Sequence, residues 1–389
     1  MSRSRPITAG LVASLVGFTS SYAVVLAGLR SVGASPAQAA SGLLALFVTQ
    51  GVGGLWLTWR TRLPVLLAWS TPGAALLAGA TMVAGGWPAA VGAFLAVGVL
   101  ILLTALWPRL GALIASIPVP IAQAMLAGVL LPLCIEPVHA LAAHPAYVAP
   151  IVLSWLALLV LAPRWAVPGA FVVCLIGVLI GAAHGSGIGG SLTPRLTLTE
   201  PTFTWAALLG IALPLYVVTM ASQNVPGVAV LASFGYEAPW RPAMTVTGIG
   251  TLVGAPAGGH AINLAAITAA IVAAPEADPD RDRRWIAAAT TGIAYLVLAP
   301  LSAALVAVAD AAPDGVFEAV AGIALLATLG GALGGATTAA EGREAAIVTL
   351  VVAASGVTFA GVGAAFWALV AGLLVHHVLA HAHRRSHFS

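Results

Sequence analysis

Charge is the scarcest property of this chain of 389 residues. Lysine is absent, and Asp, Glu and Arg together make up only 7% of the sequence, against roughly 25% in a soluble domain. A soluble fold could not bury the 60% of hydrophobic residues and still present a charged exterior. The shortage excludes the soluble classes and indicates a protein whose solvent is the hydrocarbon of a membrane, where each crossing helix needs about 20 apolar residues.

Cysteine and clustered basic residues are also scarce. The only two cysteines, Cys134 and Cys174, fall inside apolar runs, so they do not form the disulfide framework of a small secreted protein. The net charge of +3 comes from arginines scattered singly between apolar runs, which excludes a nucleic-acid-binding patch. Neither a cofactor motif nor a metal-ligand cluster is recognisable, and the C-terminal histidines are interpreted as a solvated basic tail.

Long apolar runs occupy most of the chain. The run from Trp87 to Trp107 is apolar on every face, whereas a membrane β-barrel would alternate apolar and polar residues in segments of about 10. Charged residues, glycines and prolines interrupt these runs at short intervals. The pattern predicts an all-α polytopic membrane protein with about fourteen transmembrane segments and short connections.

The arginine positions predict the orientation. With the N-terminus inside, only Arg30 and Arg195 fall on the outer side. The other thirteen fall inside: Arg3, Arg5, Arg60, Arg62, Arg109, Arg164, Arg241, Arg281, Arg283, Arg284, Arg343, Arg384 and Arg385. Positive charge marks the cytoplasmic side of a membrane protein, so we expect both termini and the charged loop Pro275–Arg284 in the cytoplasm.

Two polar breaks interrupt apolar segments at corresponding places. Ala68–Gly73 lies in the third segment, and Gly254–His260 lies in the tenth. Proline ends a helix, so each break is expected to start a half-helix with exposed N–H groups and a positive dipole end. If the chain is two halves of seven segments, such paired breaks indicate a transporter's binding site. The alternative is a pair of packing kinks.

The eighth segment and one histidine add polar groups at membrane depth. Gln223 and Asn224 precede Pro226, and two adjacent amides in an apolar helix must be hydrogen-bonded, either to a neighbouring helix or across a polar cavity. His260 is the one histidine inside the membrane region, and it could titrate near neutral pH. It is either a proton carrier or a neutral structural residue. No carboxylate lies at the centre of a segment; Glu136, Asp310 and Glu341 come nearest, at helix ends.

Five stretches together resemble the BenE-type family of benzoate:proton symporters, over essentially the whole chain. They are GFTSSYAVVLAGLRSVGAS (17–35), AWSTPGAALLAG (68–79), IPVPIAQAMLAGVLLPLC (117–134), LPLYVVTMASQNVPGVAVL (213–231) and GAPAGGHAINLAAITAAI (254–271). That family is similar in fold to the nucleobase permeases of the uracil-permease superfamily. The resemblance implies seven plus seven inverted repeats, with a short extended strand before the half-helix in the third and tenth segments.

The resemblance also implies two domains, each assembled from two parts of the chain. A core domain would comprise residues 7–107 and 203–310, and a gate domain residues 109–200 and 311–383. Nucleobase permeases carry an acidic residue on the eighth helix that binds substrate, and the matching stretch here offers Gln223. An amide there suits an anionic substrate, which a glutamate would repel, but it removes the obvious proton carrier.

We therefore expect a non-enzymatic secondary transporter of the bacterial inner membrane, which imports benzoate or a similar aromatic carboxylate with protons and can form a homodimer. The substrate ring would pack near Phe18 and Tyr22. His260 is the proton-coupling candidate, with Glu136, Asp310, Glu341 or the substrate itself as alternatives. The other predicted substrate-binding residues are Ser70, Thr71, Gly73, Gln223, Asn224, His260 and Asn263.

Two other classes stay open at this stage. A nucleobase or an inorganic anion could be carried on the same fold. An intramembrane enzyme would need either an acidic metal cluster near the membrane surface or a hydrated Ser/His pair, which Ser70 and His260 mimic only superficially. A passive channel is disfavoured because no ring of charges or repeated carbonyl filter is visible.

Overall fold

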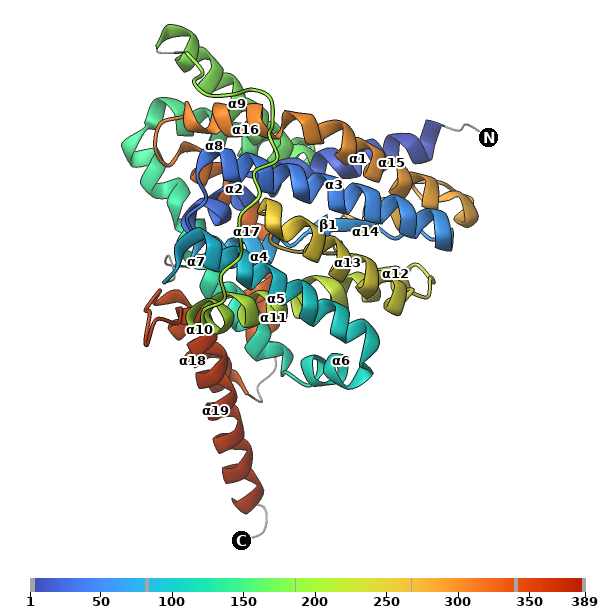
Figure 1. Cartoon of the computed structure of the whole chain (residues 1–389), viewed down its shortest axis with the longest axis vertical. Helices are drawn as coiled ribbons and strands as arrows, with labels where there is room; N and C mark the ends of the chain where they lie inside the picture. The colour runs from blue at the N-terminus through green and yellow to red at the C-terminus, as the bar shows by residue number, and fades with distance from the viewer. Residues whose placement is uncertain (1–3, 81–83, 186, 267, 339–341, 387–389) are drawn as a thin grey trace.

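The computed structural model describes residues 4–80, 84–185, 187–266, 268–338 and 342–386. Helices dominate it (Figure 1), and in the described ranges nine are long and apolar enough to cross a membrane. The all-α polytopic class is thereby confirmed, while the number of about fourteen spans stays a prediction. The remaining predicted segments are shorter, such as Pro145–Leu161.

The first half of the chain contains nine α-helices and one strand, interrupted at the predicted third segment. They are α1 (Ser4–Thr19), α2 (Tyr22–Ser31), α3 (Pro36–Thr61), β1 (Leu67–Trp69), α4 (Thr71–Ala78), α5 (Gly86–Leu106), α6 (Pro108–Ala115), α7 (Val119–Ala143), α8 (Pro145–Leu161) and α9 (Ala166–His184). The helix of the first segment stops at Thr19 and resumes at Tyr22, so Ser20 and Ser21 form a break that the sequence alone did not reveal.

The second half repeats this order with a strand in its own third position. Its elements are α10 (Trp205–Ala207), η2 (Leu208–Ala212), α11 (Leu213–Thr219), η3 (Met220–Asn224), α12 (Val225–Ser233), α13 (Trp240–Gly254), β2 (Ile262–Leu264), α14 (Ala269–Ala273), α15 (Trp285–Leu298), α16 (Ser302–Asp310), α17 (Val316–Thr337), α18 (Arg343–Ala354) and α19 (Ala364–Ser386). The two halves are inverted repeats, as expected.

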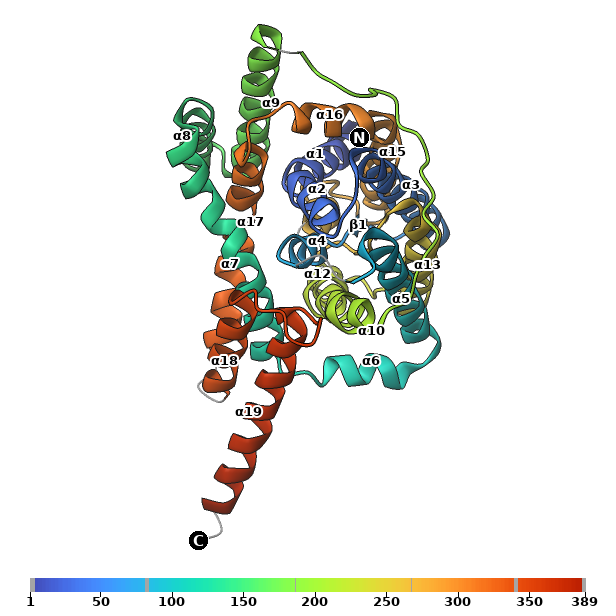
Figure 2. The same cartoon turned by 60° about the vertical axis from the view of Figure 1, so that its left-hand side comes forward.

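The helices form two groups, which Figure 2 separates. Helices α7–α9 and α17–α19 lie together on one side; within that group α7 packs along α17 and α18. Helices α1–α5 and α10–α16 form the other group, where α3 packs on α15 and α5 on α13. These groups are here called the gate group and the core group, after the predicted gate and core domains, whose boundaries stay a prediction. Their functional division stays a prediction.

Strands β1 and β2 meet at the centre of the core group as an antiparallel pair. Leu67 pairs with Leu264, and Trp69 pairs with Ile262. The pairing continues past the strands, because the Ser70 N–H donates to the Ala261 carbonyl at 3.0 Å. Extended backbone at membrane depth must satisfy its polar groups within the protein, and each strand satisfies those of the other.

The break at Gly254–His260 differs from expectation. Helix α13 ends at Gly254, and Gly258 adopts a left-handed φ of 97°, which favours glycine. The break is therefore the turn between the ninth and tenth segments, and α14 begins only at Ala269, after β2. Pro256 and the glycines signalled a helix end correctly. They could not show that the next piece is a strand, because its partner lies almost 200 residues earlier in the sequence.

Two wide helical turns interrupt the eighth segment. The π-helical turns η2 and η3 end at Ala212 and Asn224, two residues before Pro214 and Pro226 respectively. A proline cannot donate to the carbonyl four residues earlier and clashes with it. A π turn relieves this conflict, and such turns occur frequently at functional sites. Here η3 carries both Gln223 and Asn224.

An extended linker, described from residue 187 to residue 204, leads to α10 along the outside of the core group (Figure 1). The Thr197 N–H donates to the Ser41 hydroxyl at 2.9 Å, and the Trp87 indole N–H donates to the Thr199 hydroxyl at 2.9 Å. The linker is thus attached to the core group from Thr197 onward.

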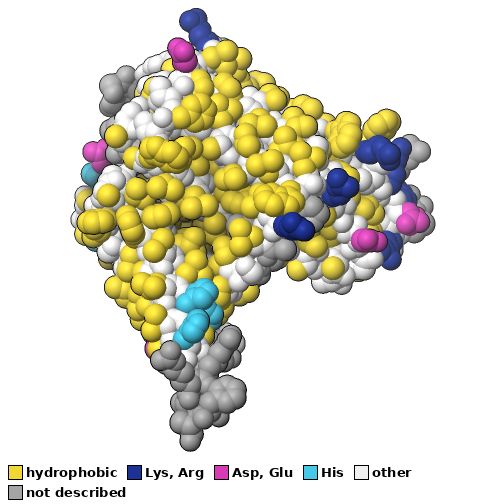
Figure 3. Space-filling model, turned by 60° about the horizontal axis from the view of Figure 1, so that its bottom comes forward, with side chains coloured by type: hydrophobic (Ala, Val, Ile, Leu, Met, Phe, Trp, Pro, Cys, Tyr) yellow, Lys and Arg dark blue, Asp and Glu magenta, His cyan; other side chains and the backbone are white. Residues whose placement is uncertain are grey.

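The surface is apolar in the manner of a membrane protein. Figure 3 shows hydrophobic side chains across most of one face, with arginine side chains gathered mainly toward one end. Large apolar residues such as Trp59, Leu161 and Val253 are more than 60% exposed. In water such a surface would cause aggregation, so it indicates contact with lipid.

Candidate functional site

A cavity lies at the centre of the core group, where the chain breaks of the first, third and tenth segments meet. Its empty volume is about 410 Å³, open mouth included. All of its lining residues are uncharged: Gly17, Ser20, Ser21, Ala68, Trp69, Thr71, Gln223, Ala265, Ala266, Thr268 and Tyr295. Of the predicted site residues, Thr71 and Gln223 are therefore brought together in this cavity.

An aromatic wall forms one side of the cavity. The rings of Trp69 and Tyr295 are stacked with centroids 6.4 Å apart and planes inclined by 30°, and Phe47 packs against both. Gly17 makes room for this arrangement, because a β-carbon there would lie 2.7 Å from the Tyr295 hydroxyl oxygen. Such a wall offers a flat apolar surface to an aromatic ligand.

The break between α1 and α2 fixes one ring of this wall. The Ser21 hydroxyl accepts a hydrogen bond from the Trp69 indole N–H at 2.7 Å and donates to the Gly17 carbonyl at 2.6 Å. Both of these bonds are internal to the protein. Ser21 therefore holds Trp69 in position.

The start of α4 provides the polar side. Ser70 is the N-cap of α4: its hydroxyl accepts a bond from the Gly73 N–H at 3.2 Å and shares a 2.8 Å bond with the Thr219 hydroxyl. Ser70 and Gly73 thus shape the helix end. Neither the N–H nor the hydroxyl of Thr71 has a partner among the described residues. These groups lie at the positive end of the helix and line the cavity.

The two adjacent amides of η3 have different environments. Asn224 is fully buried, and its side-chain oxygen accepts a bond from the Leu264 N–H at 2.9 Å, so it anchors β2. Gln223 is 8% exposed, lines the cavity and makes no hydrogen bond with any described residue. Gln223 is therefore available to a ligand.

Phe18 and Tyr22 lie outside this cavity, in an aromatic cluster between the two helix groups. Phe18 and Tyr22 each contact Phe171 of α9 edge-on, with centroids 5.6 and 5.7 Å apart, and Tyr22 also contacts Phe317 of α17 at 6.3 Å. The cluster joins the core group to the gate group. The predicted role of Phe18 and Tyr22 in substrate binding stays a prediction.

His260 and Asn263 also do not line the cavity. Both are fully buried. The His260 ring packs edge-on against Phe94 with centroids 6.4 Å apart, and neither ring nitrogen has a partner in the described part of the chain. The Asn263 amide donates to the neighbouring Leu264 carbonyl at 2.7 Å. Their predicted roles are likewise untested by the geometry.

Of the carboxylates proposed as alternative proton carriers, neither Asp310 nor Glu136 lines the cavity. Asp310, at the end of α16, pairs with Arg30 at the end of α2, and Glu136 lies near His139. Glu341 lies outside the described residues. The sequence interpretation also missed Trp69, Tyr295 and Thr268, because single aromatics and threonines in apolar segments usually belong to the core. The polar break beside Trp69 was the only available signal.

Comparisons with known proteins agree with this architecture. A family model described as "Benzoate membrane transport protein" (BenE) matches residues 2–378. The inner membrane protein YdcO of Escherichia coli (strain K12) is 40% identical over 380 residues, which cover 96% of this chain and 95% of that protein. The benzoate membrane transport protein of Acinetobacter baylyi is 28% identical over 380 residues, covering 95% of this chain and 94% of that protein.

Solved structures show the same fold at low sequence identity. The transmembrane domain of the cyanobacterial bicarbonate transporter BicA superposes with a TM-score of 0.63 at 14% identity, covering 95% of this chain and 97% of that one. The anion-transporter family member SLC26A9 superposes with a TM-score of 0.57 at 14% identity, covering 95% of this chain and 65% of that one. At this identity the likeness establishes the fold alone.

Proposed function

This chain belongs to the BenE family of membrane transporters, and from that premise we propose that it imports benzoate or a similar small aromatic carboxylate together with protons. The observation that carries the proposal is the cavity beside β1. It is lined by an aromatic wall and by hydrogen-bond donors that have no partner among the described residues. The name of the Acinetobacter baylyi relative, which is that of a benzoate transporter, supports the substrate class.

The carboxylate is proposed to lie at the start of α4. The Thr71 N–H and hydroxyl and the Gln223 amide would donate to its oxygens, and the helix dipole would stabilise its charge. No lining residue carries a negative charge that would repel it. An acidic side chain at the position of Gln223 would favour a neutral nucleobase that donates hydrogen bonds. The uncharged amide of Gln223 favours an anion. The ring would pack against Trp69 and Tyr295.

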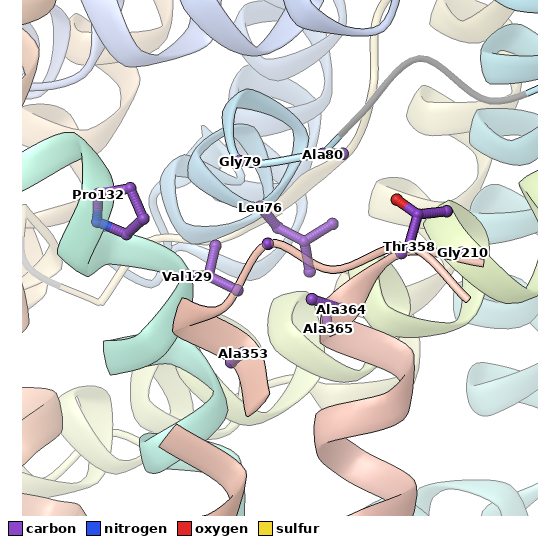
Figure 4. A pocket seen from close by; sticks show the side chains of 12 residues that line it. Leu76, Gly79, Ala80, Val129, Pro132, Gly210, Ala353, Thr358, Ala364 and Ala365 are labelled. Atoms are coloured by element: carbon purple, nitrogen blue, oxygen red, sulfur yellow. The ribbon is translucent and has the colours of Figure 1, made fainter. Parts of the chain in front are cut away.

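Transport is proposed to proceed by movement of the core group against the gate group. An apolar crevice between the groups has an empty volume of about 450 Å³ and is lined mainly by small residues (Figure 4). In it, Gly79 and Ala80 at the end of α4 lie opposite Ala364 and Ala365 at the start of α19. Small side chains let helix backbones approach closely, so the two groups can come into direct contact along this crevice.

Proton coupling is assigned to His260 or to the substrate. The cavity contains no carboxylate among its lining residues, so no acid there can exchange the proton. A buried histidine could bind a proton when the nearby site receives an anion. An aromatic acid that enters in its protonated form would carry the proton itself.

An inorganic anion is the second candidate. The fold shared with the bicarbonate transporter BicA favours it, and the uncharged donors would also suit such an ion. The aromatic wall has no evident purpose for a small hydrated anion, and therefore the aromatic carboxylate is preferred.

Competition decides between these substrates. The purified chain in proteoliposomes would take up radiolabelled benzoate, and unlabelled benzoate, bicarbonate, uracil and acetate would be added in excess. We expect benzoate alone to suppress uptake strongly. Suppression by bicarbonate or uracil at equal concentration, or the absence of benzoate uptake, would contradict the proposal.

Both termini are proposed to lie in the cytoplasm of the bacterial cell. The support is the distribution of arginines, which includes the charged loop around Arg281. A reporter that is active only in the periplasm, fused after residue 385 or inserted in this loop, should be inactive at both positions. Activity at either position would reverse the orientation.

A further inference from the structure

A second cavity, separate from the substrate cavity, lies under the extended linker on the outside of the core group. Its empty volume is about 680 Å³, open mouth included, and none of its lining residues lines the substrate cavity. It is here called the linker groove. Its lining residues are Pro36, Ala37 and Ala40 of α3, Ala303, Val306, Ala307 and Asp310 of α16, and Gly189, Gly190, Ser191, Thr193 and Arg195 of the linker.

The floor of the linker groove is apolar and smooth. Ala303, Val306 and Ala307 present only small side chains, and Ala40 continues this surface on α3. From residue 187 to residue 195 the linker makes no hydrogen bond to either helix, whereas from Thr197 onward it is bonded to Ser41. The groove is therefore an open space between the linker and two helices.

The rim of the linker groove carries one uncompensated positive charge. Asp310 also lines the groove, but its carboxylate accepts a hydrogen bond from the Arg30 guanidinium. Arg195 is exposed and has no ion pair or hydrogen bond with the described residues. The pair Arg30–Asp310 is neutral as a unit, so Arg195 leaves a net charge of about +1 at the rim by formal counting.

An occupant must combine an apolar chain with a net negative head. A small aromatic carboxylate would fill only a part of this volume, and the linker that covers the groove runs along the outside of the core group (Figures 1 and 2). Both flanking helices belong to candidate membrane spans, α3 to Pro36–Thr61 and α16 to Arg281–Asp310. We propose that the linker groove binds an anionic phospholipid, with an acyl chain along α3 and α16 and the phosphate at Arg195.

The test uses the full chain in vesicles of phosphatidylcholine that contain a small share of photoactivatable phosphatidylglycerol. We expect cross-links at the groove, in the stretches 36–40 or 303–307. Arg195→Gln should lower phosphatidylglycerol labelling ~5-fold, the factor that corresponds to about 1 kcal/mol for one arginine near an anionic bilayer. Labelling by a photoactivatable phosphatidylcholine should stay unchanged. Arg164→Gln, which removes an exposed arginine just before α9, is the matched control and should label like the wild type.

A second variant tests the apolar part of the groove. Ala37→Phe fills the groove from an exposed position near the start of α3, so it should lower labelling by both lipids. Cross-links that map elsewhere, full labelling of Arg195→Gln, or equal competition by dissolved inorganic phosphate would overturn the proposal. Because the mapping of cross-links uses the wild-type chain, it decides the matter even if both variants fold poorly. None of these readouts depends on benzoate transport.

Discussion

The amide of Gln223 allows the substrate site to be tested with one substitution. Its side chain faces the cavity with no partner among the described residues, and leucine has a similar size, so Gln223→Leu should fold normally. A hydrogen bond to a charged group contributes about 1.5–3 kcal/mol. We therefore expect the apparent KM for benzoate to rise by roughly 10- to 150-fold, with the maximal rate much less affected.

The neighbouring residue is the matched control. Asn224→Leu removes the acceptor of the Leu264 N–H, and a buried N–H without a partner costs about 1–3 kcal/mol of stability. It should lower the thermal stability of the purified protein, whereas Gln223→Leu should not. Uptake of labelled benzoate into proteoliposomes gives the KM, and a thermal melt gives the stability. An unchanged KM in Gln223→Leu, at wild-type stability, would refute the proposed site.

Three further predictions concern the aromatic wall, the helix cap and the proton. Tyr295→Leu should weaken benzoate binding by about 2- to 12-fold, as expected for an aromatic contact of about 0.5–1.5 kcal/mol. Tyr295→Phe should bind benzoate like the wild type. Equal KM values for the two variants would exclude a role of the aromatic wall in binding. Ser70→Ala removes the cap of α4 and should lower the unfolding free energy by about 1 kcal/mol; an unchanged thermal melt would contradict this. His260→Gln should retain exchange of benzoate across the membrane but lose accumulation driven by pH; accumulation at the wild-type level would make His260 structural.

The fold class was largely predictable because the local composition of the chain indicates where membrane helices lie. The apolar runs predicted the helical membrane class, and the polar break before Pro72 identified the start of α4 directly. The tenth segment was less predictable: its break at Gly254–His260 is a turn, and the position of α14 depends on the pairing of β2 with β1. Such pairing is a long-range interaction that the local sequence does not specify.

The site was predictable only in part, for the same reason. Thr71 and Gln223 are polar groups at membrane depth, which are costly unless they have a partner, and so they could be recognised. Asn224 has the same signal but bonds to the backbone of β2. Tyr295 carries no signal at all in an apolar helix. Its position in the cavity follows from the contact with Gly17, which only the packing of α1 against α15 creates.

Coupling of benzoate movement to protons is the central claim, and accumulation under an imposed gradient tests it most directly. Proteoliposomes with the purified chain would be diluted into a buffer one to two pH units more acidic than their interior, with and without an ionophore that collapses the gradient. Empty liposomes would measure the passive entry of benzoic acid. We expect labelled benzoate to accumulate at an initial rate above that of empty liposomes, and only while the gradient lasts. An initial rate equal to that of empty liposomes, or unaffected by the ionophore, would contradict the account.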